Sequence, residues 1–312
     1  VSIEFSPDDR QLISASYDRS ARIWEMKSGT LERSFPLDFP YIANACFSPD
    51  GKLISASGGE TSSSGDKKVF IWDSSSGRLL RTISQRDLDH FTKIGFSRDG
   101  RYIISSNANN SLYLWDIERG ISTRSLGGFA PQVYCVAFSP DGKLCALGHS
   151  DGSVSIWDIN AMSRLWRMKK HGMSVLGIAF TRDGKKLISA SGHELRTDIS
   201  GTLILWDAKS GEALRENTDS NGSYESIDIS SDGKTLLSAN KHNWEKSIML
   251  WDIDGIVMRR KYEFKNFPDR AKFASGSLAL VSVRSEGVVL FDLSAWRVIK
   301  TYPESTLLSI SR

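Results

Sequence analysis

The chain has few of the residues that define disulfide-rich, collagen-like or membrane-spanning proteins. Its 312 residues include three cysteines, eight prolines and 25 glycines. The cysteines, Cys46, Cys135 and Cys145, are too sparse and odd in number for a disulfide framework, which favours reduced thiols. No stretch of about 18 apolar residues occurs and no signal peptide opens the chain, so we expect neither a membrane-spanning helix nor secretion. These absences predict a cytoplasmic protein that does not act on membranes.

The chain also lacks a strong charge of either sign. Forty lysines and arginines face 37 aspartates and glutamates, which leaves a net charge of +3. No run of basic residues with interleaved aromatics occurs. Because proteins that follow a phosphate backbone need a concentrated positive surface, the sequence argues against a nucleic-acid partner.

What the chain does have is a motif that recurs seven times. An apolar strand ends in a turn reading Ser-Pro-Asp-Gly or close to it, and two more strands lead to an aromatic-Asp pair. The turns begin after Phe5, Phe47, Phe96, Phe138, Phe180, Ile229 and, in degraded form, Phe273. The aromatic markers are Trp24, Trp72, Trp115, Trp157, Trp206, Trp251 and Phe291, spaced 40 to 49 residues apart. A period in the forties over the whole chain predicts a repeat architecture.

One repeat predicts a four-stranded antiparallel sheet. Residues 133–138 are rich in strand formers, Pro140 and Gly142 suit a tight turn, and 144–147 and 154–157 form the next two strands. A more polar fourth strand follows at 164–168, as expected of an edge that meets water. Since one such sheet cannot bury both faces of its inner strands, the sheets must stack, and a ring of seven would leave no exposed end.

The closing triplets carry a family resemblance. Ile-Trp-Asp at 71–73 and 156–158, and Leu-Trp-Asp at 114–116, 205–207 and 250–252, resemble those of the WD-repeat β-propeller family. The resemblance implies an all-β fold, a seven-bladed β-propeller of four-stranded antiparallel blades over residues 1–304. Residues 305–312 would start a further repeat or form a C-terminal extension, and an eight-bladed ring with one blade missing is the alternative. The implied blades are 1–36, 39–84, 90–127, 132–169, 174–218, 223–263 and 269–304.

Members of this family commonly place a Gly-His pair ahead of each first strand, with the histidine bonded to a serine and linked through it to the tryptophan. Only His171 stands at that position here, and the resemblance implies Ser189 and Trp206 as its partners. We therefore expect packing, more than polar networks, to hold most blades. The structural residues implied in this way are His171, Ser189 and Trp206, with Trp24, Trp72, Trp115, Trp157 and Trp251 in the cores of the other blades.

Three connections are longer than the rest, and all three join a second strand to a third. They span residues 58–68, 192–200 and 241–247, and this topology gathers them on one face. Insertions on one face of a repeat array usually mark its binding side. Neutral drift in loop length is the alternative, because surface loops tolerate insertion well.

Candidate binding residues lie on that same predicted face. Trp244 is singled out because it stands in a polar loop with no obvious core to join, and aromatic residues dominate protein interfaces. Rim packing is the alternative for the aromatic candidates. The histidines have no ligand-like spacing and come from different blades, which argues against a metal site. The predicted partner-binding set is Tyr17, Arg19, Tyr41, His90, Tyr134, His149, His193, His242 and Trp244.

Nothing in the sequence nominates a catalytic residue or a cofactor. There is no nucleophile elbow, no phosphate-binding Gly-rich loop that opens a helix, and no sign of thiolate activation. The sequence therefore predicts a non-enzymatic scaffold that binds a peptide or a partner domain on the loop-rich face, within a longer multidomain protein. A sensory or regulatory propeller that controls an effector domain elsewhere is one alternative. An enzyme with a site at the channel mouth is another.

Overall fold

The structure is a computed structural model, and it describes most of the chain. The described residues are 2–8, 10–15, 20–26, 28–36, 41–59, 67–85, 91–97, 99–107, 112–126, 131–159, 161, 163–192, 201–218, 223–242, 245–274 and 277–302. The backbone alone is described at 2–3, 36, 41–43, 59, 67, 85, 91–93, 106–107, 112, 121–126, 241–242 and 245. The chain divides into two compact units, residues 1–133 and 134–312.

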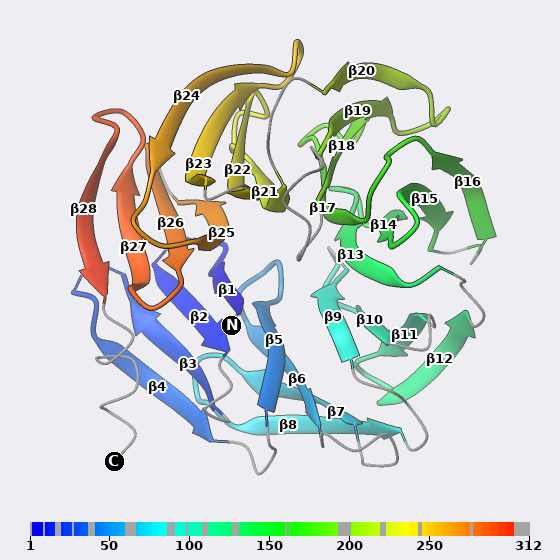
Figure 1. Cartoon of the computed structure of the whole chain (residues 1–312). Coiled ribbons are helices and arrows are strands. Elements are labelled where there is room, and N and C mark those ends of the chain that lie inside the picture. The colour runs from blue at the N-terminus through cyan, green and yellow to red at the C-terminus, as the bar shows by residue number, and fades with distance from the viewer. Residues whose placement is uncertain are drawn as a thin grey trace. The chain divides into compact units, whose positions relative to one another are not determined.

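The first unit contains three four-stranded antiparallel sheets in which each strand pairs with its neighbour in sequence (Figure 1). Its first strands β1, β5 and β9 lie side by side in that order. The strands are β1 (Ser2–Phe5), β2 (Gln11–Ala15), β3 (Ser20–Glu25), β4 (Leu31–Pro36), β5 (Tyr41–Phe47), β6 (Leu53–Gly59), β7 (Lys67–Asp73), β8 (Leu79–Gln85), β9 (Phe91–Phe96), β10 (Tyr102–Asn107), β11 (Leu112–Asp116) and β12 (Ile121–Leu126).

The second unit contains four more sheets of the same kind, the first of them starting at the unit boundary. Their strands are β13 (Val133–Phe138), β14 (Leu144–His149), β15 (Ser153–Asp158), β16 (Ser163–Lys169), β17 (Val175–Phe180), β18 (Lys186–Ser191), β19 (Leu203–Asp207), β20 (Ala213–Asn217), β21 (Tyr224–Ile229), β22 (Thr235–His242), β23 (Glu245–Asp252), β24 (Val257–Glu263), β25 (Pro268–Phe273), β26 (Leu278–Val283), β27 (Gly287–Asp292) and β28 (Arg297–Tyr302). The fold is therefore all-β, a seven-bladed β-propeller of four-stranded antiparallel blades, as the sequence predicts.

The turns between first and second strands share one bonding pattern. In six sheets a Ser or Thr hydroxyl at the end of the first strand donates to the Asp two residues later, at 2.5–2.7 Å. That Asp also accepts the backbone N–H two residues further on, at 3.0–3.1 Å. Such local bonds are why Ser and Asp favour tight turns. The six pairs are Ser6–Asp8, Ser48–Asp50, Ser97–Asp99, Ser139–Asp141, Thr181–Asp183 and Ser230–Asp232.

The Asp that follows each closing aromatic has a similar local role. Asp207 accepts the N–H groups of Lys209 and Ser210 at 3.0 and 2.7 Å, which closes the turn from β19 into β20. Asp73 and Asp292 accept bonds from the turns that follow them in the same way. Hydrogen bonds from these turns hold the pKa values of all three carboxyl groups below their usual range. The aromatic-Asp pair thus joins a core residue to a turn former.

The hydrophobic core lies between neighbouring sheets within each unit. In the second unit one cluster joins β18 and β19 to β21, β22 and β23, and Trp251 lies within it, 1% exposed. Trp206 is likewise packed against Trp166 of the preceding sheet, with ring centroids 6.1 Å apart. In the first unit Trp72 lies 5.1 Å from Phe35. Each of these third-strand aromatics therefore fills the space towards the preceding sheet.

Replacing Trp251 with Ala tests this packing. We expect a loss of about 3–5 kcal/mol in unfolding free energy, because a large cavity opens in a close-packed core. Chemical denaturation followed by fluorescence of the remaining tryptophans measures the loss. Trp251→Phe, which keeps a ring in the space, should lose clearly less. A cost below about 1 kcal/mol for Trp251→Ala would contradict the assignment.

Candidate interaction site

The structure places the predicted binding residues unevenly. Five of them, Tyr17, Arg19, His90, His193 and Trp244, lie outside the described residues. For two more, Tyr41 at the start of β5 and His242 at the end of β22, the backbone alone is described. Tyr134 is half-buried on β13. Whether these residues bind a partner stays a prediction.

His149 is not a surface residue. It is the last residue of β14, it is only 2% exposed, and its Nε2 lies 2.8 Å from the hydroxyl of Ser155 on the neighbouring strand β15. A side chain enclosed and bonded in this way stabilises its own sheet and has no surface to offer a partner. The prediction that His149 lies in a loop on the binding face is therefore wrong. β14 extends two residues beyond the predicted strand 144–147 and includes His149.

The predicted long loop at 241–247 is also corrected. β22 continues to His242 and β23 begins at Glu245, with Lys241 paired to Lys246 and His242 to Glu245. The two residues between these strands, Asn243 and Trp244, lie outside the described residues. The polar residues of this segment have low strand propensity, which is typical of a loop. The pairing of the long strands β22 and β23 outweighs that propensity.

His171 forms the network that its position predicts. Its Nε2 lies 2.6 Å from the Ser189 hydroxyl, and that hydroxyl accepts the Trp206 Nε1–H at 2.7 Å. Nδ1 of His171 contacts the hydroxyl of Thr202, which in turn lies 3.0 Å from the hydroxyl of Ser191. The histidine comes from the segment before β17 and thereby joins β18 to β19. Its role is to stabilise the sheet formed by β17 to β20.

Tryptophan–serine bonds occur in other blades without a histidine of this kind, which the sequence reading missed. Trp24 donates to Ser14, Trp115 to Ser105 and Trp251 to Ser238, at 2.8–2.9 Å. In each case the serine lies two residues beyond the residue that pairs with the tryptophan across the strands. In the second blade that position holds Ala56, and Trp72 relies on contacts with other rings. The feature that indicates these bonds is the position of the serine, two residues beyond the residue that pairs with the tryptophan.

Burial lowers the pKa of His171 to about 3, and the neighbouring Lys170 adds to the effect. The folded protein therefore holds the imidazole neutral while the unfolded chain protonates it near pH 6.5. The resulting stability is fully present above that pH and is lost as the pH falls towards 3.

Between pH 7 and pH 5 we expect the wild-type unfolding free energy to fall by about 2 kcal/mol more than that of His171→Asn. The window stops at pH 5 so that most carboxyl groups stay ionised. Urea denaturation at each pH gives the unfolding free energy of both proteins. The comparison is between the changes of this free energy with pH, so a difference in absolute stability between the two proteins does not affect the result. Parallel pH dependences would contradict a buried, neutral His171.

The turn between β14 and β15 packs directly beneath His171. Gly152 there has φ +82°, and a Cβ at this residue would lie 2.1 Å from the His171 carbonyl oxygen and 2.9 Å from that of Met173. The His171 N–H donates to the Gly152 carbonyl at 3.2 Å. Two segments of backbone therefore meet at a position that only glycine fits.

Gly152→Ala should therefore destabilise the protein strongly. Gly100→Ala is the matched control, because Gly100 also has positive φ, +69°, but has nothing within 4 Å of the added methyl group. The control should lose about 1 kcal/mol from backbone strain alone. We expect Gly152→Ala to lose at least about 2 kcal/mol more in denaturation experiments. Equal losses would mean that the close contact with His171 does not constrain the turn.

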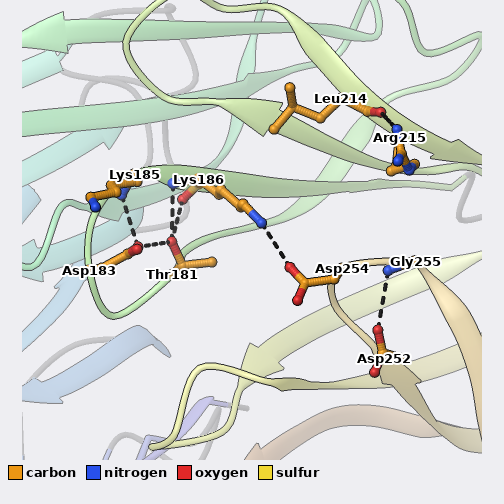
Figure 2. Close-up of polar contacts among 9 residues, drawn as sticks. All are labelled: Thr181, Asp183, Lys185, Lys186, Leu214, Arg215, Asp252, Asp254 and Gly255. Atoms are coloured by element: carbon orange, nitrogen blue, oxygen red, sulfur yellow. Dashed lines mark hydrogen bonds and ion pairs between the residues drawn. The ribbon is translucent and has the colours of Figure 1, made fainter.

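The opposite end of the same sheets is polar and locally bonded (Figure 2). Thr181 and the N–H of Lys185 donate to Asp183 and hold the pKa of that carboxyl group below its usual range. Lys186 of β18 reaches Asp254 in the turn after β23, at 2.7 Å. Because both groups of this ion pair are solvent-accessible, it adds little stability. This end is built from short turns that bond to themselves.

Nothing described points to catalysis. Cys46, Cys135 and Cys145 are all free and buried, and burial raises the pKa of the Cys46 and Cys145 thiols, which disfavours the reactive thiolate. Among the described residues no group of three or more His, Cys, Asp or Glu side chains is placed to hold a metal ion. Over the same residues no helix is long and apolar enough to cross a membrane.

Sequence comparison identifies the repeats in the first half of the chain. The profile described as "WD domain, G-beta repeat" matches residues 1–25, 39–73, 77–116 and 120–158. The fourth match ends with β15. The three sheets from β17 onward repeat the same strand order in the structure.

Curated relatives match part of the chain. Autophagy-related protein 16 of Arabidopsis thaliana is 29% identical over 126 residues, 40% of this chain and 23% of that protein. Small ribosomal subunit protein RACK1 of Caenorhabditis elegans is 29% identical over 118 residues, 37% of this chain and 34% of that protein. WD repeat-containing protein 26 homolog of Drosophila melanogaster is 33% identical over 119 residues, 36% of this chain and 18% of that protein. The matched region thus spans about a third or less of each relative.

A solved structure matches nearly the whole chain. A chain of "Crystal Structure of Mitotic Checkpoint Complex" superposes with a TM-score of 0.80, covering 96% of this chain and 86% of that one. The sequences are 18% identical, so this likeness shows the fold alone.

Proposed function

Because the chain carries the repeats of the WD family, we propose that it is a non-enzymatic scaffold for protein–protein interaction. It binds a peptide or a partner domain through the connections between second and third strands. RACK1 is named as a protein of the small ribosomal subunit, and the solved structure is that of a checkpoint complex, so chains of this kind occur within assemblies. Autophagy-related protein 16 and the WD repeat-containing protein 26 homolog, of which the matched region is less than a quarter, support a place in a longer, multidomain protein.

The observation that carries the proposal is where the connections vary in length. The connections between first and second strands contain five residues in six sheets and four residues in the seventh. Between second and third strands they range from the two residues 243–244 to the eleven residues 192–202. Both kinds join paired antiparallel strands, so packing alone would constrain them alike. Variation at one end of the sheets is typical of a binding surface carried by a constant framework.

The framework suits recognition because it is fixed before a partner arrives. The strands that lead into residues 192–202 are buried, and the Thr202 N–H donates to the Ser191 hydroxyl at 2.9 Å. A connection anchored on such strands loses less conformational freedom on binding than one on a flexible segment. Trp244 is the proposed anchor residue, since large aromatic side chains carry much of the energy of protein interfaces.

We expect Trp244→Ala to weaken capture of protein partners by at least about tenfold, the effect of losing about 1.4 kcal/mol of binding free energy. Immobilised wild type and variant are compared by quantitative mass spectrometry of the proteins retained from a lysate of the source cells. Lys209→Ala is the control, because this exposed residue lies in a turn at the opposite end of its sheet. It should leave capture unchanged.

Both variants should keep their thermal midpoints within a few degrees of the wild type, since neither change removes a described core residue. Unchanged capture by Trp244→Ala, or a loss caused equally by Lys209→Ala, would contradict binding through this end of the sheets.

A further inference from the structure

The outer strand of the fourth sheet differs from a merely solvated edge. β16 is the last strand in the order β13–β14–β15–β16, and it lies on the outer side of its sheet (Figure 1). The strand and the residue after it, Ser163 to Lys170, contain four basic residues and no acidic one. An edge strand also has backbone N–H and C=O groups that face away from its own sheet. The edge is therefore open, basic and hydrogen-bonding.

Apolar side chains are exposed along the same strand. Leu165 is 50% exposed and Met168 is 40% exposed, whereas Trp166 between them is buried and donates its Nε1–H to the Ala208 carbonyl at 3.1 Å. The pairing of β15 with β16 shifts register between Ile156 and Trp157, so that Leu165 has no residue opposite it. Trp166 therefore anchors the strand to the next sheet while Leu165 and Met168 stay available to a ligand.

The charges on this strand are only partly balanced. Arg167 pairs with Asp151 at 3.0 Å, and Lys170 pairs with Glu216 at 3.0 Å. Arg164 lies over the Trp157 ring at 5.8 Å. Among the described residues neither Arg164 nor Lys169 forms an ion pair within 4.0 Å, although Lys169 lies near enough to Asp151 to help lower the pKa of that carboxyl group. A second copy of this edge would bring like charges together, which is unfavourable. The complementary occupant is acidic.

We propose that β16 binds an extended acidic peptide, which adds to the sheet as a fifth antiparallel or parallel strand. Main-chain hydrogen bonds along the open edge supply affinity in this mode of recognition, and side chains at alternate positions supply specificity. Carboxylates of the peptide would pair with Arg164 and Lys169, and its apolar side chains would cover Leu165 and Met168. The surface runs along β16 and meets the connection between β14 and β15 at Asp151, which pairs with Arg167.

Another basic edge in the second unit is less suited to this role. On β24, Arg260 donates to the carbonyls of Leu293 and Ser294 in the next sheet, and the Lys261 carbonyl accepts the Trp296 Nε1–H at 3.0 Å. β24 also ends in an acidic residue, Glu263, which pairs with Lys261 at 3.0 Å. Side chains of the following sheet therefore occupy groups on β24 that a peptide would need.

The test uses a fluorescent synthetic peptide that alternates Glu with Val, measured by anisotropy against the full chain. We expect saturable binding that weakens at least about tenfold in the double variant Arg164→Glu, Lys169→Glu. The matched control, Lys209→Glu with Arg215→Glu, makes the same charge change on the next sheet and should weaken binding less than about threefold. Thermal midpoints confirm that the variants are folded.

A second probe separates strand addition from simple charge attraction. The same peptide with alternate backbone amides N-methylated keeps its charge but cannot donate hydrogen bonds to a strand edge. It should bind at least about tenfold more weakly than the unmethylated peptide. Trp244→Ala should bind both peptides as the wild type does, so failure of the loop-end proposal would leave this one standing.

Three results would overturn the proposal. They are the absence of saturable binding, equal binding of the methylated peptide, and equal losses in the two double variants. The first would mean that the basic residues of β16 only protect an open edge from aggregation, a common use of lysine at such positions. The other two would mean general attraction of an acidic peptide to a basic surface.

Discussion

The contact that the rest of the structure depends on is that of a third-strand aromatic with the sheet before it. A four-stranded sheet with apolar side chains on both faces has to bury both, and within each unit the neighbouring sheets provide the cover. Trp206 and Trp251 fill this space with buried indole rings. In the last sheet Phe291 is smaller, and Tyr262 and Trp296 add rings whose centroids lie 4.7 and 5.2 Å from it. The space between the sheets is thus filled in the last sheet as well, although a phenylalanine replaces the tryptophan there.

This packing leaves the two ends of the sheets under different constraints. The short turns between first and second strands satisfy their own backbone groups through the Ser–Asp bonds, so five residues are sufficient and an insertion would break the pattern. The connections between second and third strands vary in length from two to eleven residues. A constant framework and a variable end are the physical basis of the proposed scaffold function.

The sequence predicts the repeat, the strands and the His171 network because these depend on periodic, local signals. The predicted strand 133–138 agrees with β13 at both ends. The WD-repeat resemblance, applied to the histidine nine residues before Phe180, implies the contacts with Ser189 and Trp206 that the structure contains. Contacts that depend on register across strands are harder to read. The Ser238–Trp251 bond and the burial of His149 each follow from which residues face each other between paired strands, which no single segment reveals.

Strand position within a sheet also explains where new binding surfaces are able to arise. A first strand packs on its neighbours through both faces, so most substitutions there disturb a core. A fourth strand has one paired side and one open side, and its register shift next to the closing aromatic recurs in all seven sheets. That shift leaves one residue of each fourth strand without a partner opposite it, and in β16 the residue is the exposed Leu165. Recognition at an edge strand therefore draws on exposed side chains such as Leu165, while Trp166 of the same strand keeps its place in the core.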